Sequence, residues 1–119
     1  MAYNEDLEDR IDHYFITNEK LVKNKRLGWV GWLIDGNMCF GIYSDLLIVR
    51  LNDNMANTLV KKQGVNRFQQ AQDTAGTILS ISSRIYSHNE ALIKFLEGGI
   101  EYTKTLPARE TDQWTNKLD

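Results

Sequence analysis

Proline and cysteine are nearly missing from this sequence, which holds one of each in 119 residues. The single cysteine, Cys39, has no partner for an internal disulfide, and one thiol with two distant histidines does not make a zinc-ligand set. We therefore expect no bound metal and no other cofactor. A chain that uses no disulfide suits a reducing compartment, which favours a cytoplasmic location.

Long hydrophobic runs are also absent, since nowhere do about 18 apolar residues follow one another. The N-terminal stretch MAYNEDLEDRIDHYF carries five acids within its first twelve residues and lacks the apolar centre of a signal peptide. The sequence therefore predicts a soluble protein with no membrane partner.

Neither sign of charge dominates the chain, because 14 Lys and Arg stand against 16 Asp and Glu and leave a formal net charge of -2. Such a chain exerts no overall attraction on a phosphate backbone. Specific nucleic-acid binding is therefore not expected. The charge is instead gathered locally, in the acidic N-terminal stretch and in a basic segment from Lys20 to Arg26.

Apolar residues are present in the proportion of a folded protein, with 42% of the chain hydrophobic. A chain of 119 residues suits one compact domain, which we place at residues 1–107. Residues 108–119 form a charged C-terminal tail that is too short to fold alone. Three places are open to Trp114 in this tail: the surface of the domain, another subunit, or a disordered end.

Helical spacing of apolar residues predicts three helices, over about residues 4–19, 52–64 and 87–105. Asp and Glu in the first turn favour the first of them, because they face the positive end of the helix dipole. The last helix is predicted to begin with a capping box formed by Ser87 and Glu90.

Apolar runs predict three strands between the first two helices, at residues 27–34, 37–43 and 46–51. Asp35-Gly36 is a strong signal for a two-residue turn, because both positions of a type I′ turn need positive φ. Ser44-Asp45 is a weaker signal for a second turn.

Two further strands are predicted after the second helix, a short edge strand near Phe68 and an alternating one over residues 77–86. Residues 20–26 are interpreted as a polar connection. The predicted fold is α+β, with an antiparallel meander sheet, helices packed on one face and the element order α-β-β-β-α-β-β-α.

Two-residue turns at both hairpins would pair Trp32 with Cys39 and Gly41 with Ile48. The alternation of side chains then sorts the meander into two faces. The face without polar side chains is predicted to lie under the helices and comprises Leu27, Trp29, Gly31, Leu33, Met38, Phe40, Ile42, Leu47, Val49 and Leu51. The other face comprises Val30, Trp32, Ile34, Asn37, Cys39, Gly41, Tyr43, Leu46, Ile48 and Arg50.

The second face mixes aromatic, aliphatic and cationic side chains, which is the composition of an interface centre. We predict that it is buried by a protein partner or a second copy of the chain. The expected partner-binding residues are Trp32, Cys39, Tyr43, Ile48 and Arg50. Trp32, Ile48 and Arg50 should then be more exposed than residues under the helices, such as Phe40. The alternative is that the Trp114 tail or the segment near Phe68 covers this face.

The stretch KRLGWVGWLIDGNMCFGIYSDLLIVRL resembles the N-terminal domain of the TfoX family of competence regulators. The matching positions are Leu27-Gly28-Trp29, the hairpin Asp35-Gly36-Asn37-Met38, Gly41 and Val49-Arg50. In element order the likeness covers about residues 1–107. The resemblance implies an α+β fold in a stand-alone copy of the module, with a regulatory role.

Two other functions stay open. A small enzyme would use Cys39 or the acidic residues of the first helix, but neither His13 nor His88 has a sequence reason to lie beside the thiol, so a buried structural cysteine is favoured. A nucleic-acid-binding regulator would use the Lys20–Arg26 loop, whose charges are typical of a solvated loop. Gly98-Gly99 lacks the surroundings of a phosphate loop and indicates close packing on the sheet.

The sequence therefore predicts a small, non-enzymatic, cytoplasmic regulatory or protein-interaction module.

Overall fold

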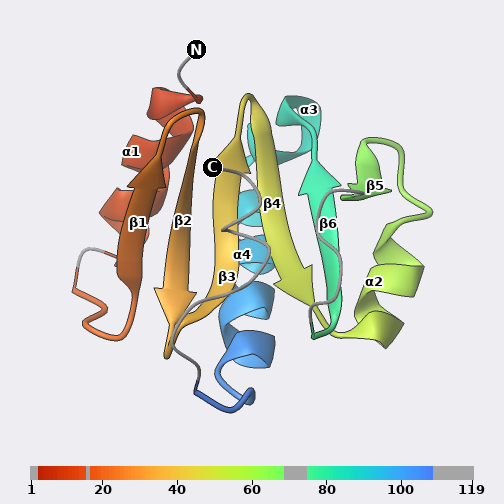
Figure 1. Cartoon of the computed structure of the whole chain (residues 1–119). Coiled ribbons are helices and arrows are strands. Elements are labelled where there is room, and N and C mark those ends of the chain that lie inside the picture. The colour runs from red at the N-terminus through yellow and green to blue at the C-terminus, as the bar shows by residue number, and fades with distance from the viewer. Residues whose placement is uncertain (1–2, 16, 69–74, 109–119) are drawn as a thin grey trace.

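The structure, a computed structural model, describes residues 3–15, 17–68 and 75–108. Its elements are α1 (Glu5–Phe15), β1 (Val22–Arg26), β2 (Trp29–Ile34), β3 (Asn37–Tyr43), β4 (Leu46–Leu51), α2 (Asp53–Leu59), β5 (Val65–Arg67), β6 (Thr77–Ile81), α3 (Ser83–Tyr86) and α4 (Asn89–Thr103). The strands in these residues form one antiparallel sheet in the order β1-β2-β3-β4-β6-β5 (Figure 1). The predicted α+β fold with a meander sheet is confirmed. Within the same residues no helix is long and apolar enough to cross a bilayer.

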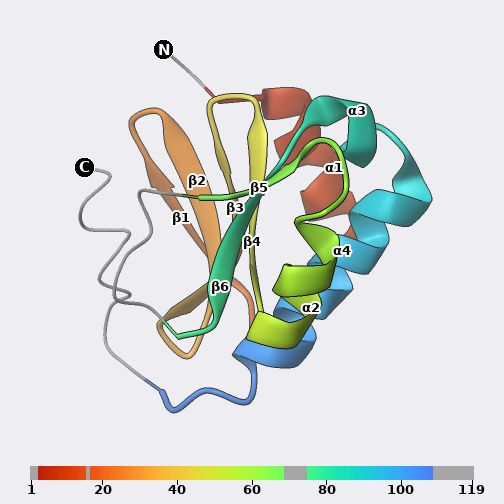
Figure 2. The ribbon, with the colours of Figure 1, turned by 90° about the vertical axis from the view of Figure 1, so that its right-hand side faces the viewer.

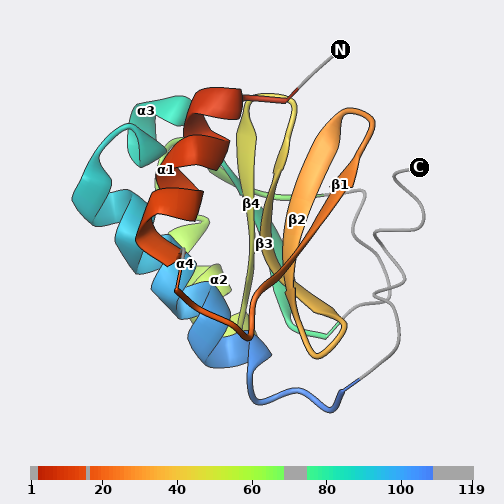
Figure 3. The same cartoon turned by 90° about the vertical axis from the view of Figure 1, so that its left-hand side faces the viewer.

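The described helices lie on one face of the sheet, as predicted (Figures 2 and 3). α1 covers the β1–β2 side, and α4 crosses behind β3 and β4. The strand residues that are buried against the helices form the helix-side core: Val30, Trp32, Ile34, Cys39, Phe40, Ile42, Leu47, Val49, Leu51, Val65, Leu79 and Ile81. A second cluster, the opposite-face cluster, contains Trp29, Leu33, Met38, Ile48, Phe68 and Ile78.

The two hairpins of the meander form where the turn signals place them. Asp35 and Gly36 have φ of 51° and 83°, as a type I′ turn requires, and Ser44 has φ of 58°. β3 and β4 consequently cover the predicted ranges 37–43 and 46–51. Gly41 pairs with Ile48, as expected from the second turn.

A β-bulge at Cys39 overturns the predicted pairing of Trp32 with Cys39. Leu33 pairs with Met38 as expected, but Trp32 pairs with Phe40, so Cys39 is an extra residue on β3. Because a bulge puts two residues opposite one, the faces of β2 exchange relative to β3. Val30, Trp32 and Ile34 therefore enter the helix-side core, whereas Trp29 and Leu33 join the opposite-face cluster together with Met38. Leu27, also assigned to the helix-covered face, is 92% exposed.

The basic segment predicted as a connection contains a strand. β1 pairs along its length with β2 and forms one edge of the sheet. Lys23 and Lys25 are exposed on it. Lysines are common on edge strands because their charge discourages pairing with another chain, so a lysine-rich run is compatible with a strand at this position.

The strand predicted over residues 77–86 ends at Ile81. The carbonyl of Ser82 accepts bonds from the backbone N–H groups of Ile85 and Tyr86, so the chain continues as α3. Ser87 closes α3, and the predicted capping box is not formed: the N-cap of α4 is His88.

Candidate functional site

The predicted partner-binding residues do not form an exposed face. Trp32, Ile48 and Arg50 are 3%, 1% and 0% exposed, no more accessible than Phe40 at 0%. The expected difference in exposure is therefore wrong. The bulge also divides the set, because Trp32 and Cys39 lie in the helix-side core and Ile48 lies in the opposite-face cluster.

Arg50 and Tyr43 have structural contacts on the opposite face. The Arg50 Nε donates to the Met38 carbonyl and an Nη donates to the Ala75 carbonyl, both at 2.7 Å, which ties the sheet to the segment before β6. Tyr43 is half-buried and meets Phe68 edge to face, with 5.6 Å between ring centroids. Phe68 thus contributes to covering this face, as the alternative prediction held, whereas the Trp114 tail lies outside the described residues.

Cys39 is placed as a structural residue. Its side chain is fully buried, and its Sγ donates to the Trp32 carbonyl at 3.2 Å. Burial raises the pKa of the thiol to about 12, because a thiolate would be deprived of water. A nucleophile needs the thiolate form, so this geometry gives no support to a thiol-based enzyme.

Two acids of α1 form ion pairs with lysines of the basic strand β1. Lys23 Nζ lies 2.7 Å from a Glu8 carboxylate oxygen and 2.6 Å from one of Asp12, and Tyr3 donates a hydrogen bond to Glu8. Burial by itself would raise the pKa of Glu8, but the Lys23 ammonium and the Tyr3 hydroxyl outweigh it and hold that pKa below its usual value. These contacts occupy Glu8, Asp12 and Lys23, which belong to the groups considered for acid–base catalysis or for phosphate binding.

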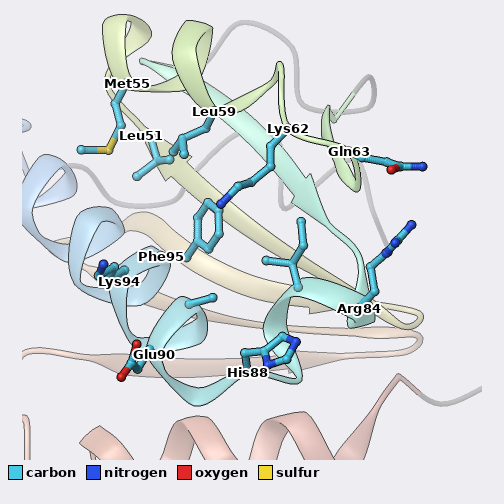
Figure 4. Close-up of a pocket in the computed structure, with 12 residues that line it drawn as sticks. Leu51, Met55, Leu59, Lys62, Gln63, Arg84, His88, Glu90, Lys94 and Phe95 are labelled. Atoms are coloured by element: carbon cyan, nitrogen blue, oxygen red, sulfur yellow. The ribbon is translucent and has the colours of Figure 1, made fainter.

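A groove on the helical side of the molecule is a better candidate for a site (Figure 4). It lies between α2 on one side and α3 and the start of α4 on the other, with a volume of about 730 Å³. We call it the α2/α4 groove. It is lined by Leu51, Met55, Leu59, Lys62, Gln63, Arg84, Ile85, His88, Glu90, Ala91, Lys94 and Phe95.

The floor of the α2/α4 groove is apolar. Leu51 comes from the end of β4, and Phe95 comes from α4, whereas Met55 and Leu59 project from α2 (Figure 4). Leu51 and Phe95 are buried at 1% and 7% exposure, whereas Met55 is 44% exposed, so the apolar surface that is open to solvent lies on the α2 side.

The rim of the α2/α4 groove is basic. Lys62, Arg84 and Lys94 line it from three separate segments, against the single carboxylate of Glu90. Among residues 3–15, 17–68 and 75–108, none of the three cations forms an ion pair with a carboxylate. The same part of the chain contains no group of three His, Cys, Asp or Glu side chains that could hold a metal ion. The groove can therefore bind an apolar group that carries negative charge at its edges.

The groove was not predicted from the sequence. The helical spacing of the second helix puts Met55, Ala56 and Leu59 on one face, but only Ala56 is buried among the residues of α2. The available signal was a short helix with several apolar residues, followed directly by Lys61 and Lys62.

Comparisons with models of protein families, with curated proteins and with solved structures found no match to this chain. The resemblance to the TfoX N-terminal domain consequently stays a prediction.

Proposed function

We propose that this protein is a non-enzymatic protein-interaction module that binds its partner in the α2/α4 groove. The observation that carries the proposal is a groove whose apolar lining is exposed at Met55 and whose three cations form no ion pair within the described residues. Exposed apolar surface that is bordered by charge is typical of a surface that binds another protein.

The remaining chemistry of the chain favours binding over catalysis. The thiol of Cys39 is sealed in the core, and Glu8 and Asp12 are engaged by Lys23. A regulatory role of the kind implied by the TfoX resemblance needs only such a binding surface. A buried free cysteine is also compatible with the reducing cytoplasm in which we place the protein.

Site-specific photo-crosslinking in cells of the source organism tests the proposal. A photoreactive phenylalanine analogue at Met55 should give a discrete crosslinked adduct, because Met55 stands at the mouth of the groove. The matched control places the same analogue at Leu27, which is more exposed, at 92% against 44%. Non-specific hydrophobic contact would therefore favour the control position.

The adduct at Met55 should disappear when Ala91 in the groove is changed to Gln, which adds polar bulk to the lining and keeps a good helix former in α4. Equal crosslinking at positions 27 and 55, or an adduct that persists in the Ala91→Gln variant, would contradict the proposal.

A further inference from the structure

The charge of the α2/α4 groove is opposite in sign to that of the whole chain. The protein carries -2 overall, yet three cations and one carboxylate line the groove. The excess of positive charge is therefore a local property of this site. Complementary charge guides a partner to such a site and disfavours partners of the wrong sign. The occupant should accordingly carry acids along its edges.

The apolar floor of the groove indicates a second property of the occupant. Its apolar side chains come from β4, α2 and α4 and form one continuous depression (Figure 4). Met55 at its mouth has an unbranched, adaptable side chain of the kind found on surfaces that accept varied apolar groups. The occupant should therefore present an apolar stripe between its acids.

The walls of the groove indicate which backbone conformation the occupant has. They consist of residues of α2, α3 and α4 and of the turns that follow α2 and α3, so the lining presents no strand edge to which an extended peptide could add. A peptide that leaves water must satisfy its own N–H and C=O groups, and a helix does so internally. Apolar anchors at positions i, i+4 and i+7 of a helix span about 10 Å, the scale of a pocket of this size.

From these three features we infer that the α2/α4 groove takes an acidic amphipathic α-helix of a partner protein, with its apolar stripe on the floor and its carboxylates beside Lys62, Arg84 and Lys94. This inference rests on the proposed function and specifies the class of partner. A free fatty acid would match the floor, but its single carboxylate would leave two of the three cations unused.

The test uses the full chain and a fluorescent peptide of about 16 residues, long enough to form a helix in water. The peptide places Leu at i, i+4, i+7 and i+11 and Glu at the flanking positions. Two control peptides have the same length: one scrambles the Leu positions, and the other replaces every Glu by Lys. Binding is measured by fluorescence anisotropy, and by competition with dodecanoate.

The acidic helical peptide should bind best, and its affinity should fall as ionic strength rises, because salt screens exposed charges. A double variant, Arg84→Glu with Lys94→Glu, should weaken binding by roughly tenfold or more. The matched control, Lys20→Glu with Lys104→Glu, makes the same change of charge away from the groove and should leave affinity unchanged.

Equal binding of the scrambled or the lysine peptide would overturn the inference. So would a groove variant that loses the binding of dodecanoate but keeps that of the acidic peptide. In each of these cases a groove-specific crosslink at Met55 would still support the proposed function. Loss of the crosslink would instead remove both.

Discussion

Gly99 lies where α4 packs closely on the sheet. A Cβ at this position would stand 2.8 Å from the Cys39 carbonyl oxygen and 3.2 Å from a methyl of Val49. A backbone oxygen at a bulge cannot move aside without disturbing the sheet. We therefore expect Gly99→Ala to lower the free energy of unfolding by about 1–3 kcal/mol, as overpacking does elsewhere, in urea denaturation.

Gly98 provides the matched control on the same helix. Its added Cβ would lie 3.1 Å from the Cδ2 of Leu51, the end of a side chain that can turn. Alanine also favours the helix over glycine by about 0.5–1 kcal/mol. Gly98→Ala should therefore be close to neutral or stabilising. Equal losses for the two variants would show that close packing at Gly99 is not the cause.

The thiol of Cys39 gives a second prediction for a single residue. With its pKa raised to about 12 by burial, the thiolate fraction at pH 8 is about one in ten thousand, and the side chain is fully covered. A disulfide reagent such as DTNB should therefore label the native protein only as fast as the protein unfolds. The same protein in denaturant should react at once. Rapid labelling of the native state would reopen an enzymatic role.

At the scale of elements, the contact between α1 and β1 depends on the charge of Glu8. Its pKa is lower in the folded protein than the ordinary value of 4.5, so the unfolded chain binds the proton more tightly. The stabilisation is therefore complete above about pH 4.5 and is lost as the pH falls through the folded pKa. Glu8→Gln should lower stability at neutral pH and flatten the loss of stability on acidification.

The control for this prediction is Glu5→Gln, an exposed position on the same helix. It removes the same formal charge without affecting the ion pair with Lys23. Its acid denaturation curve, followed by circular dichroism, should track that of the parent. If the Glu8→Gln curve also tracks the parent, the ion pair with Lys23 contributes nothing to acid stability.

Turn chemistry explains why part of the sheet could be predicted. Asp35-Gly36 and Ser44-Asp45 are local signals, and they place both hairpins and the full extent of β3 and β4. The bulge at Cys39 has no such signal, because an extra residue is accommodated by packing against other elements and not by its neighbours in the chain. One unrecognised residue was enough to exchange the faces of β2 and to make a buried face look like an interface.

The groove could not be predicted from local signals either, because its residues come from segments that are far apart in the sequence. Leu51, Ile85 and Phe95 are unremarkable core residues in their own segments, and Arg84 lies in a segment predicted as a strand. Their assembly into one depression depends on how α2, α3 and α4 pack on the sheet. A candidate site of this type is visible only after the tertiary structure is known.

At the scale of the molecule, the distribution of charge predicts weak interaction with nucleic acid. The net charge is -2, and Lys23 and Lys25 are partnered by the carboxylates of α1. We therefore expect no specific binding of duplex DNA by the purified protein at about 0.15 M salt, measured by fluorescence anisotropy. Micromolar or tighter binding that is abolished by charge reversal at Lys23 and Lys25 would contradict this.

The helix that covers the centre of the sheet is the last described element of the chain. α4 begins at Asn89 and packs on β3 and β4, whose residues are synthesised much earlier. Since N-terminal residues leave the ribosome first, α1 and the meander are complete while the part of the sheet over β3 and β4 still lacks α4. A nascent chain that stops before α4 leaves the helix-side residues of β3 and β4 without the packing that α4 provides. Stable folding must therefore wait until translation has passed α4, and products truncated before that point are candidates for chaperone binding or aggregation.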